Sequence, residues 1–89
     1  MRAVITVIGK DMVGILAATA TICAEHNVNI NDVTQSVLQD MFAMIMMVDI
    51  SAMTTNFDEF ASILENMGKE KNLVIKVMHE DIFNAMHRI

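Results

Sequence analysis

The chain has 89 residues, of which 54% are hydrophobic and 19% charged, and its mean hydropathy is +0.44, so it is predicted to form one folded domain over residues 1–89 and not a disordered chain. The net charge is −5 and the six lysines and arginines form no basic stripe, which excludes the clustered positive charge needed to bind nucleic acid or an anionic membrane surface. No apolar run reaches the ~20 residues that span a bilayer.

The predicted elements begin with a strand at residues 2–8, which is β-branched and almost entirely apolar, as in a strand buried on both faces. A tight loop at residues 9–14 follows, and apolar residues at helical spacing then predict a helix that ends near residue 26. Asp11 is the predicted N-cap of this helix, because its carboxylate can accept hydrogen bonds from the first backbone amides. The predicted inner stripe of the helix consists of Ile15, Leu16, Thr19, Ile22, Cys23 and His26.

Two further strands are predicted at residues 29–38 and 41–50, with a short turn at residues 39–40. Alternation along the first of them puts Val33, Gln35 and Val37 on one face and Ile30, Asp32, Thr34 and Ser36 on the other. The third strand is apolar on both faces, with Phe42, Met44, Met46 and Val48 on one and Ala43, Ile45 and Met47 on the other.

After a loop at residues 51–56, Asn56 and Glu59 have the spacing of a capping box and predict the start of a second helix. Its predicted buried stripe is Phe57, Phe60, Ala61, Leu64 and Met67. Residues 68–72 are predicted to terminate this helix, residues 73–79 to form a fourth strand, and residues 80–89 to form a short final helix. Ile82, Phe83, Met86 and Ile89 would share one face of that helix.

The order βαββαβ followed by a helix predicts an α+β fold, a ferredoxin-like sandwich with a four-stranded antiparallel sheet and two helices on one face. The second apolar face of the third strand then needs a cover. The short C-terminal helix can cover part of it and a second subunit the rest, so the chain is predicted to be a homodimer or a higher homo-oligomer.

The reactive side chains predict no catalytic or metal site. Cys23 is the only cysteine, which excludes an intrachain disulfide and a cysteine metal cluster and favours a reducing, cytoplasmic location. It lies on the predicted inner stripe of a helix, where an inert thiol is expected. His26, His79 and His87 have no metal-ligand spacing. We therefore expect neither an enzyme nor a bound cofactor.

The loop from Gly9 to Gly14 is the most informative segment for function. It leads from a buried strand into a helix N-terminus, where exposed backbone amides and the helix dipole favour a carboxylate or phosphate. Gly14 would allow a ligand to approach the backbone closely. The alternative is an ordinary strand-to-helix turn, in which glycine and aspartate are common. The loop is not a phosphate-binding P-loop, because no Lys-Ser/Thr pair follows the second glycine.

Asn29, Asn31 and Asp32 begin the second strand. In the predicted topology they lie at the opposite end of the sheet from the first loop of the same chain. They could still serve a ligand at a junction between subunits, and the alternative is a turn rich in Asx residues.

The segments 3–17 and 29–35 resemble the ACT domain family. The matching pattern is a strand, G-x-D-x-x-G-I, a helix and N-I-x-D-x-x-Q. The residues that match it are Gly9, Asp11, Gly14, Ile15, Asn29, Ile30, Asp32 and Gln35. The specific part covers about residues 3–37 and is similar to the ACT modules of the glycine-cleavage-system repressor and formyltetrahydrofolate deformylase. Small stand-alone ACT proteins are the relatives that the whole chain suggests.

This resemblance implies a regulatory module that senses a small molecule, most often an amino acid, where two domains meet. The implied ligand-binding residues are Gly9, Lys10, Asp11, Met12, Val13 and Gly14 of one subunit and Asn29, Asn31 and Asp32 of the next. Met12 departs from the polar residue that many relatives carry after the aspartate. The implied partners are a second copy, an amino acid effector and a separate, unidentified protein. The alternative function is a ligand-free interaction module.

Overall fold

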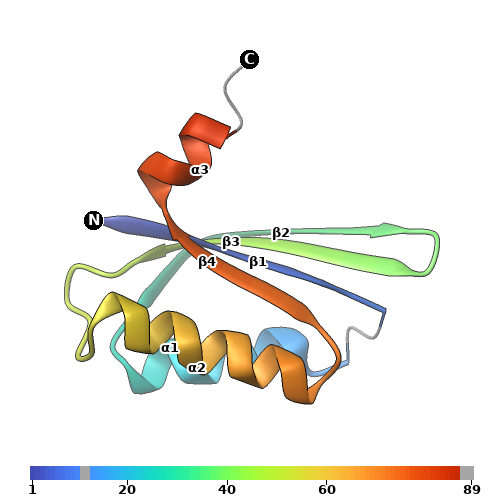
Figure 1. Ribbon diagram of the computed structural model, residues 1–89, viewed down its shortest axis with the longest axis horizontal. Coiled ribbons are helices and arrows are strands. Elements are labelled where there is room, and N and C mark those ends of the chain that lie inside the picture. Colours follow the sequence, from blue (N-terminus) through green and yellow to red (C-terminus); the bar gives the residue numbers. More distant parts are fainter. Residues whose placement is uncertain (11–12, 87–89) are drawn as a thin grey trace.

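The computed structural model describes residues 1–10 and 13–86 and contains a four-stranded antiparallel sheet with strand order β2-β3-β1-β4. Its elements are β1 (Arg2–Gly9), α1 (Ile15–Glu25), β2 (Asn29–Leu38), β3 (Met41–Asp49), α2 (Phe57–Glu70), β4 (Val74–His79) and α3 (Glu80–Met86). Helices α1 and α2 cover one face of the sheet, while α3 lies on the other side (Figure 1). The predicted ferredoxin-like sandwich is confirmed, with strand and helix ends that shift by one or two residues at most places.

The core lies between the sheet and the helices α1 and α2. Residues that pair directly across an antiparallel sheet point to the same face, so the pairing of Ile5 with Met46 and of Val7 with Met44 places these side chains together under the helices. Phe60 and Leu64 of α2 are fully buried against them. The residues of the third strand that the alternation groups together, Phe42, Met44, Met46 and Val48, are all buried on this face.

The opposite face of the sheet is only partly covered, as its composition predicted. We call it the open face, and its described residues are Arg2, Val4, Thr6 and Ile8 of β1, Asn29, Asp32, Thr34 and Ser36 of β2, Met41, Ala43, Ile45, Met47 and Asp49 of β3, and Val74, Lys76 and Met78 of β4. Ile45 keeps 41% of its surface exposed at the centre of this face.

A β-bulge corrects the predicted alternation of β2. Ile30 pairs with Val48, whereas Asp32 pairs with Met47, so Asn31 is an extra residue opposite β3. Val48 faces the helices, and Ile30 therefore lies on the helix side and not with Asp32 on the open face. The bulge shifts the two-residue period by one position.

The start of α2 confirms the predicted capping role of Asn56, whose side chain accepts a hydrogen bond of 2.8 Å from the backbone N–H of Glu59. The end of α2 differs from the prediction. Gly68 lies inside the helix, which continues to Glu70. Because Gly68 has no side chain, β4 can pass close to the helix at this position. A Cβ at Gly68 would lie 2.8 Å from Cγ1 of Ile75. Asn72, in the left-handed region (φ 60°), turns the chain into β4.

The start of α1 also differs from the prediction. The N-cap position belongs to Gly14 (φ 74°) and not to Asp11, and within residues 1–10 and 13–86 no side chain caps this helix end. Asp11 precedes the cap by three residues and lies, with Met12, outside the described residues. Residues 87–89 of the predicted final helix also lie outside them. Within residues 1–10 and 13–86, no helix has the length and apolar character to cross a membrane.

Candidate functional site

The loop that joins β1 to α1 provides the first group of candidate residues. Gly9 is buried at the end of β1, where a Cβ atom would overlap the Leu73 side chain. Lys10 and Val13 are exposed, and Val13 keeps 84% of its surface in solvent. Asp11 and Met12 complete the candidate set by sequence alone, since they lie outside the described residues.

Gly14 is the residue of this loop whose backbone requires glycine. Its φ of +74° lies in the left-handed region, and no heavy atom lies within 4 Å of the position that a Cβ would take. The carbonyl of Gly14 accepts the backbone N–H of Ala18 at 2.9 Å, which begins the hydrogen-bonding of α1. Among the described residues, nothing fills the space beside the helix start and no side chain caps it, so this helix end can accept an anionic group from outside.

The start of β2 provides the second group. Asn29, Asn31 and Asp32 are all exposed, and Asn31 is the bulged residue. One carboxylate oxygen of Asp32 accepts the backbone N–H of Val33 at 2.9 Å, so the side chain is oriented by its own strand. The bulge re-aims side chains at the edge of the sheet, a placement that is common beside binding sites. The alternation of side chains along β2 did not predict this bulge.

The two groups lie at opposite ends of the sheet in one chain. Gly9 pairs with Phe42 at one end of β3, and Asn29 pairs with Asp49 at the other. Seven residues of strand separate these pairs, which is about 23 Å at 3.3 Å per residue. One chain cannot bring the loop and the start of β2 to the same small molecule. The sequence predicted this separation from the topology, and the register confirms it.

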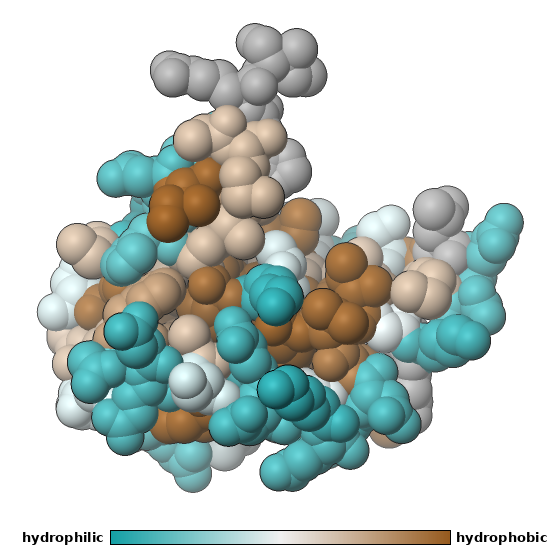
Figure 2. All heavy atoms as spheres, viewed as in Figure 1, coloured by the Kyte–Doolittle hydropathy of each residue, from teal (hydrophilic) through white to brown (hydrophobic). Residues whose placement is uncertain are grey.

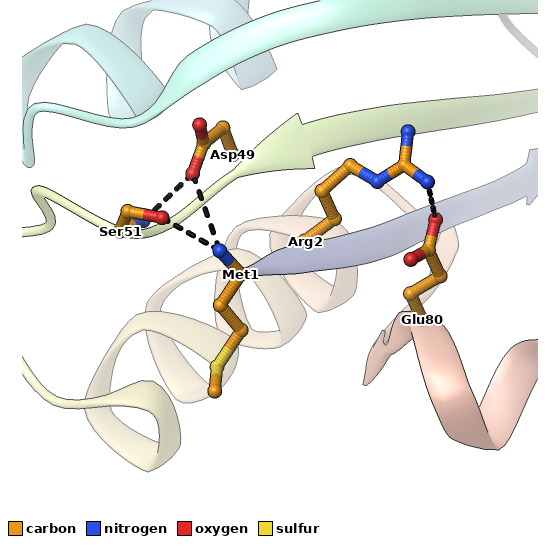
Figure 3. A network of polar contacts seen from close by, with 5 residues as sticks. All are labelled: Met1, Arg2, Asp49, Ser51 and Glu80. Atoms are coloured by element: carbon orange, nitrogen blue, oxygen red, sulfur yellow. Dashed lines mark hydrogen bonds and ion pairs between the residues drawn. The ribbon is translucent and has the colours of Figure 1, made fainter.

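A polar network at the Asn29 end of the sheet was not predicted from the sequence. The terminal ammonium of Met1 donates a hydrogen bond to Oγ of Ser51 at 2.6 Å and lies 3.9 Å from Oδ1 of Asp49 (Figure 3). Ser51 also donates its backbone N–H to Asp49 at 2.9 Å. Hydrogen bonds from the side chain and the backbone of Ser51, with the nearby charges of the chain terminus and Arg2, lower the pKa of Asp49. The partners are some 50 positions apart in sequence, beyond the reach of local patterns.

A cavity lies beside this network, between the chain start and α3. It has a volume of about 560 Å³ and is lined by Met1, Arg2, His79, Glu80, Asp81 and Ile82. An ion pair between Arg2 and Glu80 links β1 to α3 next to it (Figure 3). Of the residues predicted to bind a ligand, none that the structure describes lines this cavity.

The histidines and the cysteine have structural surroundings. His26 packs edge-on against Phe60 with ring centroids 6.1 Å apart, and His79 stacks on Phe57 at 4.0 Å. His87 lies outside the described residues. Among the described residues, no group of three or more His, Cys, Asp or Glu side chains is placed to hold a metal ion. Cys23 is buried, and burial raises the pKa of its thiol to about 11.

Cys23 is expected to react slowly with thiol reagents in the native protein. Because the pKa is raised to about 11, the thiol stays protonated near pH 8, whereas the unfolded chain ionises around its ordinary value. The rate of alkylation, measured with and without denaturant at pH 8, should rise at least tenfold on unfolding. Equal rates in the two states would mean that Cys23 is accessible and reactive.

Comparison with known proteins places these features in context. A family model described as ACT domain matches residues 2–78. The UPF0237 protein lin0537 of Listeria innocua is 49% identical over 89 residues, which cover 100% of both chains. An ACT domain protein from Streptococcus pneumoniae is 37% identical and superposes with a TM-score of 0.81 over 98% of both chains.

A more distant similarity extends the fold relationship. A formyltetrahydrofolate deformylase from Pseudomonas syringae pv. tomato superposes with a TM-score of 0.77 at 20% identity, over 88% of this chain and 27% of the deformylase. At this identity the similarity concerns the fold alone. The resemblance to the module of that enzyme, noted from the sequence, is thus confirmed at the level of architecture.

Proposed function

The chain belongs to the ACT domain family, and from this premise we propose that it is a regulatory protein that binds an amino acid between two copies of itself and acts on a separate partner protein. ACT domains are typically small-molecule-sensing regulatory modules. The observation that carries the proposal is the separation of about 23 Å between the loop at Gly9 and the start of β2 at Asn29. Two groups with complementary chemistry are held apart in one chain and can meet only across a subunit junction.

The chemistry of the two groups suits the two charged ends of an amino acid. The uncapped start of α1 at Gly14 offers backbone N–H groups and the positive end of the helix dipole to an α-carboxylate. An α-ammonium group needs acceptors. Asp32 retains acceptor capacity beyond its bond to Val33, and the side-chain carbonyls of Asn29 and Asn31 supply more.

The surroundings also favour one class of amino acid side chain. Val13 is highly exposed in the loop, so an apolar group lies next to the proposed carboxylate position. The net charge of the protein is already −5, which disfavours an acidic ligand through long-range repulsion. We therefore propose a small or apolar amino acid as the effector.

A ligand that bridges two subunits can regulate a partner by favouring one dimer geometry over another. The ligand shifts that equilibrium only by its difference in affinity for the two geometries. The partner would recognise the favoured geometry. The second candidate function, a ligand-free interaction module, is favoured by the partly uncovered apolar side chains of the open face, such as Ile45 at 41% exposure.

Calorimetric titration with a panel of free amino acids tests the proposal. We expect saturable binding with a Kd below about 1 mM, equivalent to roughly 4 kcal/mol. Asn31→Ala should weaken this binding several-fold, because it removes an acceptor at the bulge. Asn66→Ala is the matched control, since Asn66 is an exposed asparagine on α2, away from both groups, and it should bind as the wild type does.

The titration also separates the two candidate functions. Absence of binding by any amino acid at millimolar concentration would reject the sensor and favour the ligand-free module. Binding that is unchanged by Asn31→Ala would place the ligand elsewhere, with the cavity beside Arg2 and His79 as the next site to mutate.

A further inference from the structure

The open face has the composition of an interface centre surrounded by a polar rim. Its central residues, such as Thr6 and Ile45, carry no charge, while Lys76 lies on the edge strand β4 and Asp32 on the edge strand β2. Depletion of charge at the centre is characteristic of protein interfaces. Figure 2 shows hydrophobic atoms gathered along the sheet, between α3 and the hydrophilic outer surface of α2.

The open face is covered at one end and bare at the other. Val4 faces the open side and is nevertheless fully buried, because α3 contacts β1 and β4 at that end. At the other end, Ile8 is 46% exposed and Val74, which neighbours it across the sheet, is 58% exposed. The apolar surface that α3 leaves bare is thus concentrated at the end nearest the first loop.

Helix α3 contacts β1 and β4 but is not buried by its own chain. It has seven residues, none of which is buried, and it rises away from the sheet (Figure 1). Helices this short are unstable in water without packing. Ile82 is 53% exposed and Met86 is 67% exposed, so α3 presents apolar side chains to a surface outside the chain. The cavity of about 560 Å³ lies beside this helix and is lined in part by Ile82.

A two-fold axis perpendicular to the strands brings α3 of one copy to the bare end of the other. When two open faces meet and the axis lies between them, this rotation reverses the strand direction of the second copy. The bare end at Ile8 and Val74 of each copy then lies opposite α3 of the other copy, on the same strands, β1 and β4. An axis parallel to the strands would instead bring both α3 helices to the same end of the interface, so that neither helix covers the bare end of the other copy.

The open face supplies most of the area that a stable dimer needs. Four strands spaced about 4.8 Å apart and eight residues long give a footprint of about 19 by 26 Å, or about 500 Å². Side-chain relief and α3 add to this footprint, and a standard interface takes about 800 Å² from each partner. Lys76 lies on an edge strand, where its long side chain can extend to solvent past the partner.

We propose that the open face is the self-association surface of this protein, on which a second copy packs with its strands reversed and each α3 covers the Ile8–Val74 end of the other. This proposal rests on the homodimer of the proposed function and specifies its partner surface. The reversed strands also suit the proposed effector site, because this arrangement turns the loop end of one copy toward the Asn29 end of the other.

Sedimentation equilibrium of two matched variants at micromolar concentration tests the surface. Val74 and Val37 are both valines on edge strands with nearly equal exposure, 58% and 57%, but Val74 is on the open face and Val37 is on the opposite face. The wild type and Val37→Asp should be dimers, while Val74→Asp should weaken the dimer at least tenfold. Circular dichroism should show that both variants stay folded, since both positions are exposed.

Disulfide crosslinking tests the orientation. A tagged Ile82→Cys chain mixed with an untagged Val74→Cys chain should form a mixed disulfide dimer, and the pair Ile82→Cys with Val37→Cys should not. Buried Cys23 does not compete because its thiol is inaccessible. A monomeric wild type, equal dissociation by Val74→Asp and Val37→Asp, or equal crosslinking to the two valine positions would overturn the proposal.

These outcomes are distinct from failure of the proposed function. If amino acids bind a dimer that Val74→Asp leaves intact, the sensor stands and the open-face interface is wrong. If Val74→Asp dissociates the dimer but no amino acid binds the wild type, the interface stands and the sensor is wrong.

Discussion

Replacing Phe60 with alanine is expected to lower the free energy of unfolding by about 3–5 kcal/mol. Phe60 is the largest of the fully buried side chains and joins the three parts of the core, because it extends from α2 toward the sheet and packs edge-on against His26 at the end of α1. Alanine would leave a cavity that neighbouring side chains fill only in part. A domain of this size has a total stability of only about 5–10 kcal/mol, so the variant should lose much of it.

Urea denaturation followed by circular dichroism measures this effect. Phe57→Ala is the comparison, because Phe57 is a phenylalanine in the same helix that is only half-buried and stacks on His79 at the edge of the core. Its loss should be clearly smaller than that of Phe60→Ala. A loss below about 1 kcal/mol for Phe60→Ala would show that the core between α1, α2 and the sheet is not packed as described.

Replacing Gly14 with valine is expected to cost about 1–3 kcal/mol of stability and to weaken amino acid binding. The cost arises from the backbone alone. No atom lies within 4 Å of a Cβ at this position, but the φ of +74° is strained for a β-branched residue. A shift of the backbone to relieve that strain would turn the first amides of α1 away from the proposed carboxylate position.

Gly14→Asn separates strain from crowding. Asparagine tolerates the left-handed region, so this variant should lose less stability than Gly14→Val in thermal unfolding while still adding a side chain beside the proposed ligand. If Gly14→Val changes neither the melting temperature nor the binding isotherm, the loop has no special backbone role. If Gly14→Asn is destabilised as much as Gly14→Val, the cost is steric and the open space at Gly14 is wrong.

Local patterns in the sequence determined the elements and much of the core. The two-residue period of β3 correctly separated Met44 and Met46, which are buried, from Ile45, which is exposed on the open face. Asn56 and Glu59 correctly marked the start of α2. These features depend on neighbours within about four positions, where the pattern of apolar side chains and the hydrogen-bonding groups of the backbone act directly.

The candidate site was predictable in its parts but not in its arrangement. The glycines of the first loop and the asparagines of β2 were identified from the sequence, and the topology already implied that they lie apart. The role of Asp11 as an N-cap was not confirmed, since Gly14 holds that position. A glycine in the left-handed conformation can end a strand-to-helix turn without a side-chain cap, and the sequence does not distinguish the two solutions.

The sequence by itself determined which residues are apolar, how they alternate and where helices and strands begin, because those properties are local. Three features were decided only by the tertiary structure. The first is the bulge at Asn31, which moves Ile30 to the helix side. The others are the continuation of α2 through Gly68 and the direction in which α3 leaves the sheet. Each of these depends on a contact between segments distant in sequence: β2 with β3, Gly68 with Ile75, and Glu80 with Arg2. Their free energies exist only once the sheet has formed.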